Sequence, residues 1–594
     1  MPRKPTPAAT EPRTAATPPR AAETPTQKLD RLTQAAVAPL TGGLSPVSLG
    51  LATADWAWHL ALSPGRQLEL AALALQLGRQ HLQEGLSPST APPAPEDDPR
   101  FRDEAWAQWP HRQWRAGFHA AEAFWHDAAH VPGMTAHHAQ ITRFFARQWL
   151  DMLAPANWPA TNPQVQQDLW QHSGAHLRQG LQHWLADTTG TPDADTPPQR
   201  FRLGHDVAAT PGKVVFRNAL IELIRYAPQT STVHPEPVLI VPSWIMKYYI
   251  LDLSPHNSMV RYLVQQGHTV YMLSWRNPDA HDAELTMDDY LRLGVLDALQ
   301  AVGVQHGTDT PVHAMGYCLG GTLLAIAAAA LARPQGVAGQ DQLPPLQSLS
   351  LLAAQTDFSE PGELGLFIDE GQIDWLDHTT RGQGYLSGKQ MAGSFEFLHS
   401  RDLVWARRMR EYLLGERDQP NDLMAWNADT TRMPARMHHE YLTDLYLNNA
   451  LARGSYRVEG RPVSLDDLRL PVFMVGTQRD HVSPWTSVYK LHHLCDAEIT
   501  FALTNGGHNA GIISEPGHAG RHYQWATRPA NGPWTEAADW AASAPRHEGS
   551  WWSAWQAWLA ARSSAPQPAA RIPKASVLCD APGTYVLQRY REKN

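Results

Sequence analysis

Cysteine is scarce in this sequence, with three residues among 594. So few thiols exclude a disulfide framework and are typical of a reducing cytoplasm. A membrane-spanning helix needs roughly 18 consecutive apolar residues, and the longest apolar run, residues 322–332, is too short. The amino terminus also lacks the apolar segment of a secretory signal. Positive charge is not in excess either, because 49 Lys and Arg stand against 58 Asp and Glu. The net charge of −9 argues against a nucleic-acid-binding protein.

The residues that are present fit a large globular protein. Hydrophobic residues make up 43% and charged residues 18%, and a chain of this length holds roughly two to four domains. Residues 1–28 are rich in Pro, Ala, Thr and Arg without periodicity, so we expect a disordered tail. A mitochondrial targeting segment is the alternative reading of this tail, but Glu11 and Glu23 count against it.

Helical patterns dominate the next part of the chain. Ser45-Pro46 and Ser63-Pro64 each place an N-cap residue before a proline that suits the first helical position, and each precedes an apolar run. Stretches rich in Pro near residues 86–100 and at 190–200 are typical of linkers. We therefore expect a helical N-terminal domain over residues 29–200, with a linker near 86–100.

Residues 201–594 change in character, because short apolar runs now alternate with helical segments. Such alternation predicts an α/β domain with a mostly parallel sheet. The insert at about 357–465 is mainly helical in pattern and far longer than an ordinary connection, so we expect it to form a cap over the site. The candidate strands are residues 213–217, 221–226, 237–241, 269–275, 312–316, 348–354, 472–476 and 499–503.

The hexapeptide 316–321 (GYCLGG) lies between a candidate strand and an apolar helical run. Strand, sharp turn and helix form the context of a nucleophile elbow, in which glycines allow the tight turn. The helix N-terminus behind Cys318 favours a thiolate, and the N–H of Leu319 is a candidate oxyanion donor. A buried structural cysteine in a glycine-rich turn would produce the same hexapeptide.

Two downstream residues favour the catalytic interpretation. Asp480 follows the candidate strand 472–476, and His508 follows the candidate strand 499–503. The order nucleophile, acid, histidine is that of α/β-hydrolases, with the histidine expected after the last strand. His508 would take the proton of Cys318, and Asp480 would orient the imidazole. His481 and Asp357 are rivals for the base and acid roles, at positions that fit less well.

A second oxyanion donor is expected from the loop after strand 237–241. Pro242 has no N–H, so Ser243, Trp244 or Ile245 must supply the donor, and Ile245 is our candidate.

A cysteine nucleophile also indicates acyl transfer. A thiolate that attacks a thioester yields another thioester, so the acyl group stays activated, whereas an ester on serine would lose most of that activation.

Ordered motifs along the chain make it similar to the class I polyhydroxyalkanoate (poly-3-hydroxybutyrate) synthases. The resemblance spans nearly the whole chain after the tail. The motifs that carry it are 41–46 (TGGLSP), 55–56 (DW), 63–65 (SPG), 210–215 (TPGKVV), 247–253 (KYYILDL), 267–270 (GHTV), 274–278 (SWRNP), 316–321 (GYCLGG), 426–431 (WNADTT) and 549–552 (GSWW).

The resemblance implies an α/β-hydrolase fold with a catalytic triad of Cys318, Asp480 and His508. It also implies an acyltransferase that polymerises (R)-3-hydroxyacyl-CoA, such as 3-hydroxybutyryl-CoA, into polyester and releases CoA. The implied setting is a cytoplasmic homodimer on the surface of the granule it makes, with granule-coat proteins as further partners. Met246 stands where Asn is usual in the family, and Asn509 stands where an aliphatic residue is usual.

Two other functions remain open at this stage. A cysteine-dependent thioesterase or polyester hydrolase would share the fold, and a granule-coat protein would need no catalysis.

No metal or cofactor is expected, because the paired histidines lack metal-ligand spacing and no P-loop or dinucleotide fingerprint is present. The tryptophans Trp551, Trp552, Trp555 and Trp558 recur at helical spacing, which favours a core-packing face over a polymer-contacting one.

Overall fold

The computed structural model describes residues 24–26, 28–30, 33, 45–86, 98–189, 201–398, 400–417 and 419–589. The expected tail at 1–28 and the expected linkers near 86–100 and at 190–200 lie largely outside these residues. Among the residues described, no helix is both long enough and apolar enough to cross a membrane.

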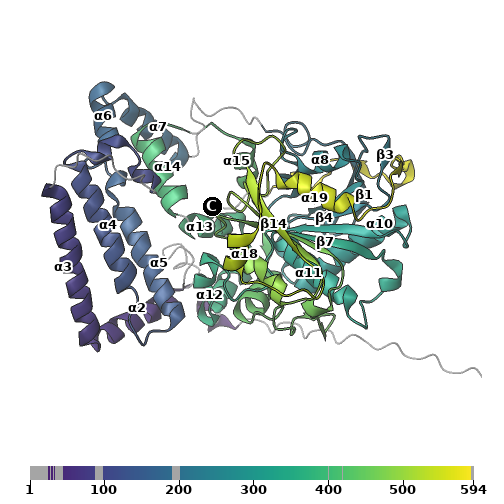
Figure 1. Cartoon of the computed structure of the whole chain (residues 1–594), viewed down its shortest axis with the longest axis horizontal. Helices are drawn as coiled ribbons and strands as arrows, with labels where there is room; N and C mark the ends of the chain where they lie inside the picture. Colours follow the sequence, from purple (N-terminus) through teal and green to yellow (C-terminus); the bar gives the residue numbers. More distant parts are fainter. Residues whose placement is uncertain are drawn as a thin grey trace, which may run out of the picture.

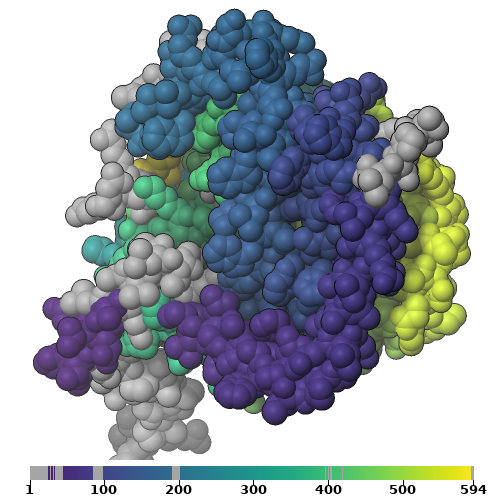
Figure 2. Space-filling model, turned by 90° about the vertical axis from the view of Figure 1, so that its left-hand side faces the viewer, coloured from purple at the N-terminus to yellow at the C-terminus, as the bar shows by residue number. Residues whose placement is uncertain are grey.

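Helices of the N-terminal region form a separate layer beside the sheet, on the left of Figure 1. Helix α2 begins as its sequence predicts, because the Ser45 hydroxyl accepts a hydrogen bond from the Ser48 N–H and Pro46 occupies the first turn. Helices α2 and α3 form one edge of the face shown in Figure 2. The helices are α2 (Pro46–Ala61), α3 (Pro64–Leu86), α4 (His111–Ala128), α5 (Ala136–Leu153), α6 (Pro163–Gln171) and α7 (Ala175–Thr189).

The rest of the chain is built on an 11-stranded sheet in the order β15-β14-β13-β12-β7-β6-β4-β5-β2-β1-β17. All eight expected strands are present. They are β1 (Gly212–Arg217), β2 (Ile221–Tyr226), β4 (Val238–Val241), β5 (Val270–Trp275), β6 (Val312–Tyr317), β7 (Leu346–Leu352), β12 (Val472–Thr477) and β13 (Ile499–Thr504).

The expectation of a mostly parallel sheet holds only for its centre. The six strands from β13 to β5 pair in parallel, whereas the strands outside them pair antiparallel. Three strands of this sheet were not expected from the sequence, namely β14 (His522–Arg528), β15 (Arg546–Glu548) and β17 (Cys579–Asp580). Strands β15 and β17 are the two edge strands and β14 lies next to β15, and all three lack continuous apolar runs because they are partly exposed.

Helices cover both faces of the sheet (Figure 1). Helices α10 (Asp297–His306) and α11 (Leu319–Ala332) pack in one core, and α8 (Met259–Gln265) and α19 (Trp551–Ala560) in the other. All four tryptophans of α19 are buried in the second core. The core-packing interpretation of this motif is therefore confirmed, and the polymer-contacting alternative is wrong.

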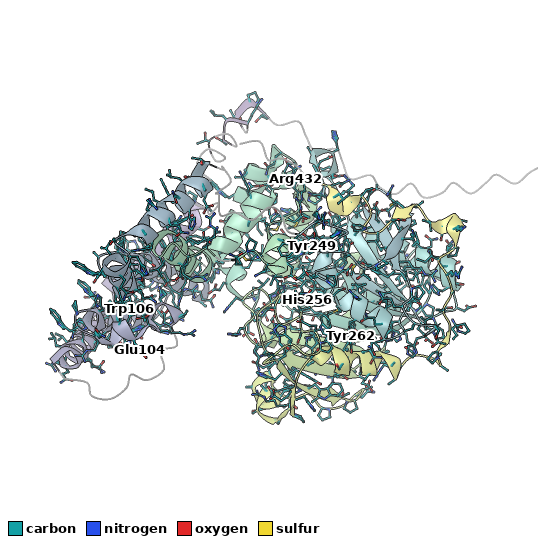
Figure 3. The ribbon with its side chains drawn as sticks, turned by 90° about the horizontal axis from the view of Figure 1, so that it is seen from above. Glu104, Trp106, Tyr249, His256, Tyr262 and Arg432 are labelled. Atoms are coloured by element: carbon teal, nitrogen blue, oxygen red, sulfur yellow. The ribbon has the colours of Figure 1, made fainter. Side chains whose placement is uncertain are left out.

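The long insert between β7 and β12 is mainly helical, as expected. It contains α12 (Glu370–Arg381), α13 (Gly388–Leu398), the π-helices η10 (Ser400–Trp405), η11 (Met409–Leu413) and η12 (Tyr441–Leu447), and the short helices α14 (Ala406–Arg408), α15 (Asp422–Asn427) and α16 (Ala435–Glu440). In the view from above, Arg432 of this insert lies with Tyr249 beside the sheet, while Trp106 lies in the separate N-terminal layer (Figure 3).

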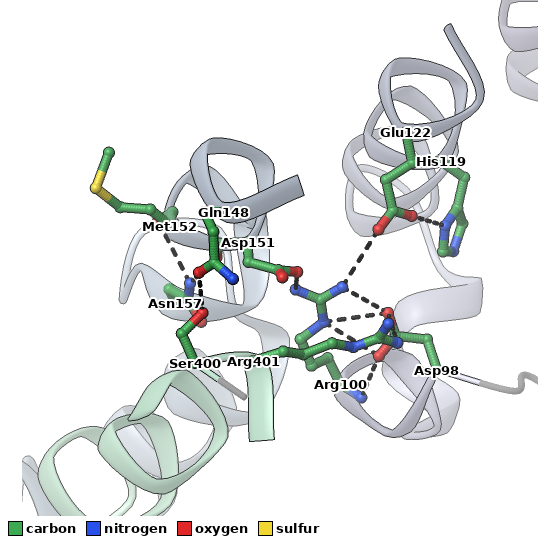
Figure 4. Close-up of polar contacts among 10 residues, drawn as sticks. All are labelled: Asp98, Arg100, His119, Glu122, Gln148, Asp151, Met152, Asn157, Ser400 and Arg401. Carbon is green, nitrogen blue, oxygen red and sulfur yellow. Dashed lines mark hydrogen bonds and ion pairs between the residues drawn. The ribbon is translucent and has the colours of Figure 1, made fainter. Parts of the chain in front are cut away.

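A buried ion network joins the N-terminal helices to the insert (Figure 4). Arg100 lies at its centre and is 2% exposed, and it donates to Asp98 and to Asp151 at 2.7 Å each. Arg401 of η10 reaches Asp98 at 2.8 Å. The network also includes Glu122 of α4, whose carboxylate lies 3.5 Å from Arg100. The N-terminal layer is thus tied to the insert by charge pairs as well as by apolar contacts.

Candidate active site

Cys318 lies at the junction between β6 and α11, in the strand–turn–helix context that the sequence predicts. Its φ is 53° and its ψ is −128°, a region that costs a non-glycine residue free energy and is common at functional sites. The turn is possible because Gly316 and Gly320, two residues before and after Cys318, have no side chain. A Cβ added to Gly320 would lie 2.3 Å from the Val241 carbonyl oxygen. The cysteine side chain is half-buried at this turn.

The two candidate oxyanion donors differ in their present partners. Leu319 is the first residue of α11, where backbone N–H groups have no acceptor within the helix. The Ile245 N–H instead donates to the Ser243 hydroxyl at 3.2 Å. A substrate oxygen at Ile245 would therefore have to compete with the Ser243 hydroxyl, a feature that the sequence did not indicate.

The insert holds the loop that carries Ile245. The Thr431 hydroxyl donates to the carbonyl oxygens of Trp244, at 2.9 Å, and of Ile245. The Trp426 indole donates to the Lys247 carbonyl at 2.7 Å. The motif 426–431 thus contacts the loop beside the elbow, which explains why residues so far apart in the sequence belong to one site.

Asp480 and His508 are brought together, with His508 Nδ1 2.8 Å from Asp480 Oδ2. Asp480 is itself fixed, because it accepts the N–H groups of Val482 and Ser483 and the hydroxyl of Thr477. Burial alone would raise the pKa of Asp480, but the charge and the hydrogen bond of His508 lower it. Asp480 is therefore held as a carboxylate.

His508 also interacts with Cys318. Burial alone would lower the pKa of His508, but the charge of Asp480 and then that of Cys318 outweigh burial, so this pKa lies well above its usual value. Because Nδ1 is bonded to Asp480, Nε2 is the ring atom left for Cys318. The arrangement favours an imidazolium beside the Cys318 sulfur, where it can act as an acid and base for that group.

The rival residues have other surroundings. Asp357 accepts hydrogen bonds from Ser359 and Asn449, and His481 lines a cavity of about 920 Å³ between the N-terminal helices α4 and α5 and the Asp480 loop. His508 follows β13, the last parallel strand, but it is not after the last strand of the sheet, because β14 and β15 come later in the chain.

Two aromatic residues that the sequence did not single out lie close enough to the thiol to interact with its charge. Tyr441 and Tyr446 of η12 are buried and joined by a hydrogen bond of 3.0 Å between their hydroxyls. Burial, and to a smaller degree the charge of Cys318, raise the pKa of both hydroxyls, so they remain protonated. Their distance from Cys318 in the sequence left no local signal for this contact.

The strand order and the helices on both faces of the sheet define the fold class of this protein as the α/β-hydrolase fold. A family model for the alpha/beta hydrolase fold matches residues 236–514. An alpha/beta hydrolase fold protein from Chitinophaga pinensis aligns over 52% of this chain and 94% of its own, with 12% identity and a TM-score of 0.27.

Two further family models match other parts of the chain. They are the poly-beta-hydroxybutyrate polymerase N terminal, at residues 24–66, and the poly-beta-hydroxybutyrate polymerase (PhaC) N-terminus, at residues 97–263. The poly(3-hydroxyalkanoate) polymerase of Methylorubrum extorquens is 38% identical over 76% of this chain and 74% of its own. The poly(3-hydroxyalkanoate) polymerase subunit PhaC of Cupriavidus necator is 37% identical over 86% and 84%. The chain belongs to the poly(3-hydroxyalkanoate) polymerase family and is an acyltransferase-type polyhydroxyalkanoate synthase.

Proposed function

We propose that this synthase polymerises (R)-3-hydroxyacyl-CoA, with a short-chain unit such as 3-hydroxybutyryl, through a thioester on Cys318. His508 is the general base and acid, and Asp480 orients it. The observation that carries this assignment is the 2.8 Å bond between His508 Nδ1 and Asp480 Oδ2, which directs the other ring nitrogen to the cysteine. The same fold would serve a thioesterase, but membership of the polymerase family favours the synthase.

The first half of the cycle loads the enzyme. Cys318 gives its proton to His508 and attacks the thioester carbonyl carbon. The carbon–sulfur bond to CoA breaks, and CoA leaves with the proton from His508. The N–H groups of Leu319 and Ile245 are the proposed donors to the oxygen of the tetrahedral intermediate, with Ile245 exchanging its Ser243 partner for that oxygen.

The second half extends the chain. The 3-hydroxyl of a second unit, or of the chain end, gives its proton to His508 and attacks the acyl carbon on Cys318. An ester bond forms, the carbon–sulfur bond breaks, and the thiolate is restored beside the imidazolium. Water must be kept from the thioester during this step, and the buried tyrosine pair of η12 supports an enclosed site.

Product analysis tests the proposed function. The protein with (R)-3-hydroxybutyryl-CoA is expected to release CoA and form insoluble polyester, with little free hydroxy acid. Acetyl-CoA is the matched control, because it can acylate Cys318 but has no 3-hydroxyl for extension. CoA release from acetyl-CoA should stop near one equivalent per active site. Stoichiometric 3-hydroxybutyrate in place of polymer would identify a thioesterase instead.

We also propose that the helical domain at 29–200 contacts the granule, which would place the enzyme at the granule surface in the cytoplasm. Exposed apolar side chains support this assignment. Helix α2 and the residue after it expose Val47, Leu51, Trp58 and Leu62, and α3 exposes Leu68, Leu75 and Leu82 at intervals of seven residues. The face of α3 with Leu70 instead packs inward. The proposed assembly is a homodimer, with granule-coat proteins as further partners. Residues 201–594, including the insert at about 357–465, form the proposed catalytic domain.

Removing the apolar stripe of α3 is expected to separate granule binding from catalysis. Leu68→Gln, Leu75→Gln and Leu82→Gln together keep helix propensity but remove the apolar contact area. Binding to polyester particles, measured by co-sedimentation, should fall by about tenfold or more, while the initial rate of CoA release stays unchanged. Val304→Gln, Leu578→Gln and Leu587→Gln form the matched control, because these exposed residues lie in the catalytic part. Equal loss in both triple variants would contradict a specific surface on α3.

A further inference from the structure

A hydrogen bond joins the two residues that flank the proposed nucleophile and base. The Tyr317 hydroxyl donates to Asn509 Oδ1 at 2.7 Å. Tyr317 directly precedes Cys318, and Asn509 directly follows His508. The bond therefore lies next to the Cys318–His508 interaction. It gives the end of β6 and the His508 loop a second connection.

The two ends of this bond differ in rigidity. Tyr317 is the last residue of the central strand β6, is 2% exposed and packs in the same core as α19. His508 and Asn509 instead lie in the segment 506–511 (GGHNAG), where three of six residues are glycine. Glycine leaves the backbone many accessible conformations, so the sequence of this loop does not by itself fix the imidazole.

Other contacts hold the loop on the carboxyl side of the histidine, while Asp480 binds Nδ1 of its ring. The indoles of Trp551 and Trp552 donate to the carbonyls of Gly511 and Ile512 at 3.1 Å and 2.9 Å. The Tyr317 ring packs against the His508 ring, with centroids 5.6 Å apart and planes tilted by 33°. Tyr317 thus touches the imidazole with its ring and the next residue with its hydroxyl.

We propose that the Tyr317–Asn509 hydrogen bond positions the imidazole of His508 against Cys318, so that Asn509 is a positioning residue of the synthase. The inference rests on the proposed function for the roles of Cys318 and His508. An aliphatic residue at position 509 would leave the buried tyrosine hydroxyl without this acceptor. The asparagine in this chain therefore adds a connection that an aliphatic side chain cannot make.

Alkylation of Cys318 tests the position of the imidazole without any polymerisation. The groups around the thiol that bear on its titration are His508, Asp480, Tyr317, Tyr441 and Tyr446. An imidazolium beside a thiol stabilises the thiolate, so the pH midpoint of thiol alkylation reports how closely the imidazole is held. The rate of carboxymethylation by iodoacetamide against pH, read from the Cys318 peptide by mass spectrometry, reports that midpoint.

Tyr317→Phe and Asn509→Leu are each expected to raise this midpoint by roughly half a unit to one unit, the size of one hydrogen bond. The double variant should show the same shift as either single variant, because one bond is lost in all three. Asn509→Asp keeps an acceptor for the Tyr317 hydroxyl, but its negative charge disfavours the thiolate, so a rise of the midpoint in this variant reflects charge and not loss of the bond. Cys579 is the internal control, and its alkylation profile should not change.

Tyr317→Phe and Asn509→Leu should also each lower kcat by about three- to tenfold, with KM for the acyl-CoA little changed. Unfolding midpoints of the variants separate positioning from loss of stability. Unchanged alkylation profiles in both single variants, or shifts that add in the double variant, would overturn the inference. An alkylation profile that responds as expected in a protein that forms no polymer would leave the inference standing and would reject the proposed function.

Discussion

Replacement of Cys318 by alanine is expected to abolish CoA release and polymer formation while the fold remains intact. Alanine keeps the Cβ and therefore the same strained backbone at the elbow, so the cost of that conformation does not change. Only a half-buried sulfur is lost. Removal of a nucleophile lowers turnover by on the order of 10⁴-fold or more. Initial CoA release, measured with a thiol reagent that is calibrated for the protein's own cysteines, gives the test.

Cys318→Ser is the informative companion variant. The hydroxyl occupies the same position beside His508, but the acyl group would become an oxygen ester and lose its activation for transfer. We expect at most a single acylation in this variant, seen by intact-protein mass spectrometry as one stable added acyl unit. Full CoA release by Cys318→Ala would locate the chemistry at another group, and loss of the native unfolding transition would show that the cysteine is structural.

The centre of the fold is readable from sequence because its strands are buried on both faces. Six parallel strands appear as short, largely apolar runs, and each lies within a few residues of its expected position. Strand β14 (His522–Arg528) escaped notice because His, Gln, Thr and Arg interrupt its apolar residues. Partial exposure removes the signal on which the prediction depends.

The sequence likewise predicts one part of the proposed site and not the other. Cys318, Asp480 and His508 each follow a strand in a glycine-rich or polar turn, so local sequence identifies the candidates and chain order identifies their roles. Contacts between distant segments leave no local pattern. Asn509 lies 192 residues from Tyr317, and Thr431 lies 186 residues from the Ile245 carbonyl that it contacts. Such pairs can be identified only from the folded structure, because the sheet determines which loops lie next to one another.

Arg100→Met is expected to destabilise the protein by about 3–5 kcal/mol, the usual cost of leaving buried charges unpaired. The guanidinium neutralises Asp98 and Asp151, which are 7% and 1% exposed at their side chains. Arg401 still reaches Asp98, but Arg100 is the partner to which Asp151 is hydrogen-bonded. Chemical unfolding followed by tryptophan fluorescence measures the change. Arg546→Met is the matched control, because its pair with Glu548 is 59% and 76% exposed, and its unfolding midpoint should not move.

The pH dependence of the same variant tests the electrostatic cause. Burial would raise the pKa of Asp98, but the hydrogen bond and charge of Arg100 lower it, so this pair stabilises the wild type above the unfolded-state pKa and loses that effect as pH falls. Without Arg100 both buried carboxyls should bind protons more tightly when folded than when unfolded. The stability deficit of Arg100→Met should therefore be larger at pH 7 than at pH 5. Adding Asp98→Asn and Asp151→Asn should recover much of the loss, because no unpaired buried carboxylate then remains. A deficit that is equal at both pH values and unaffected by the asparagines would assign the role of Arg100 to packing of its hydrocarbon stem.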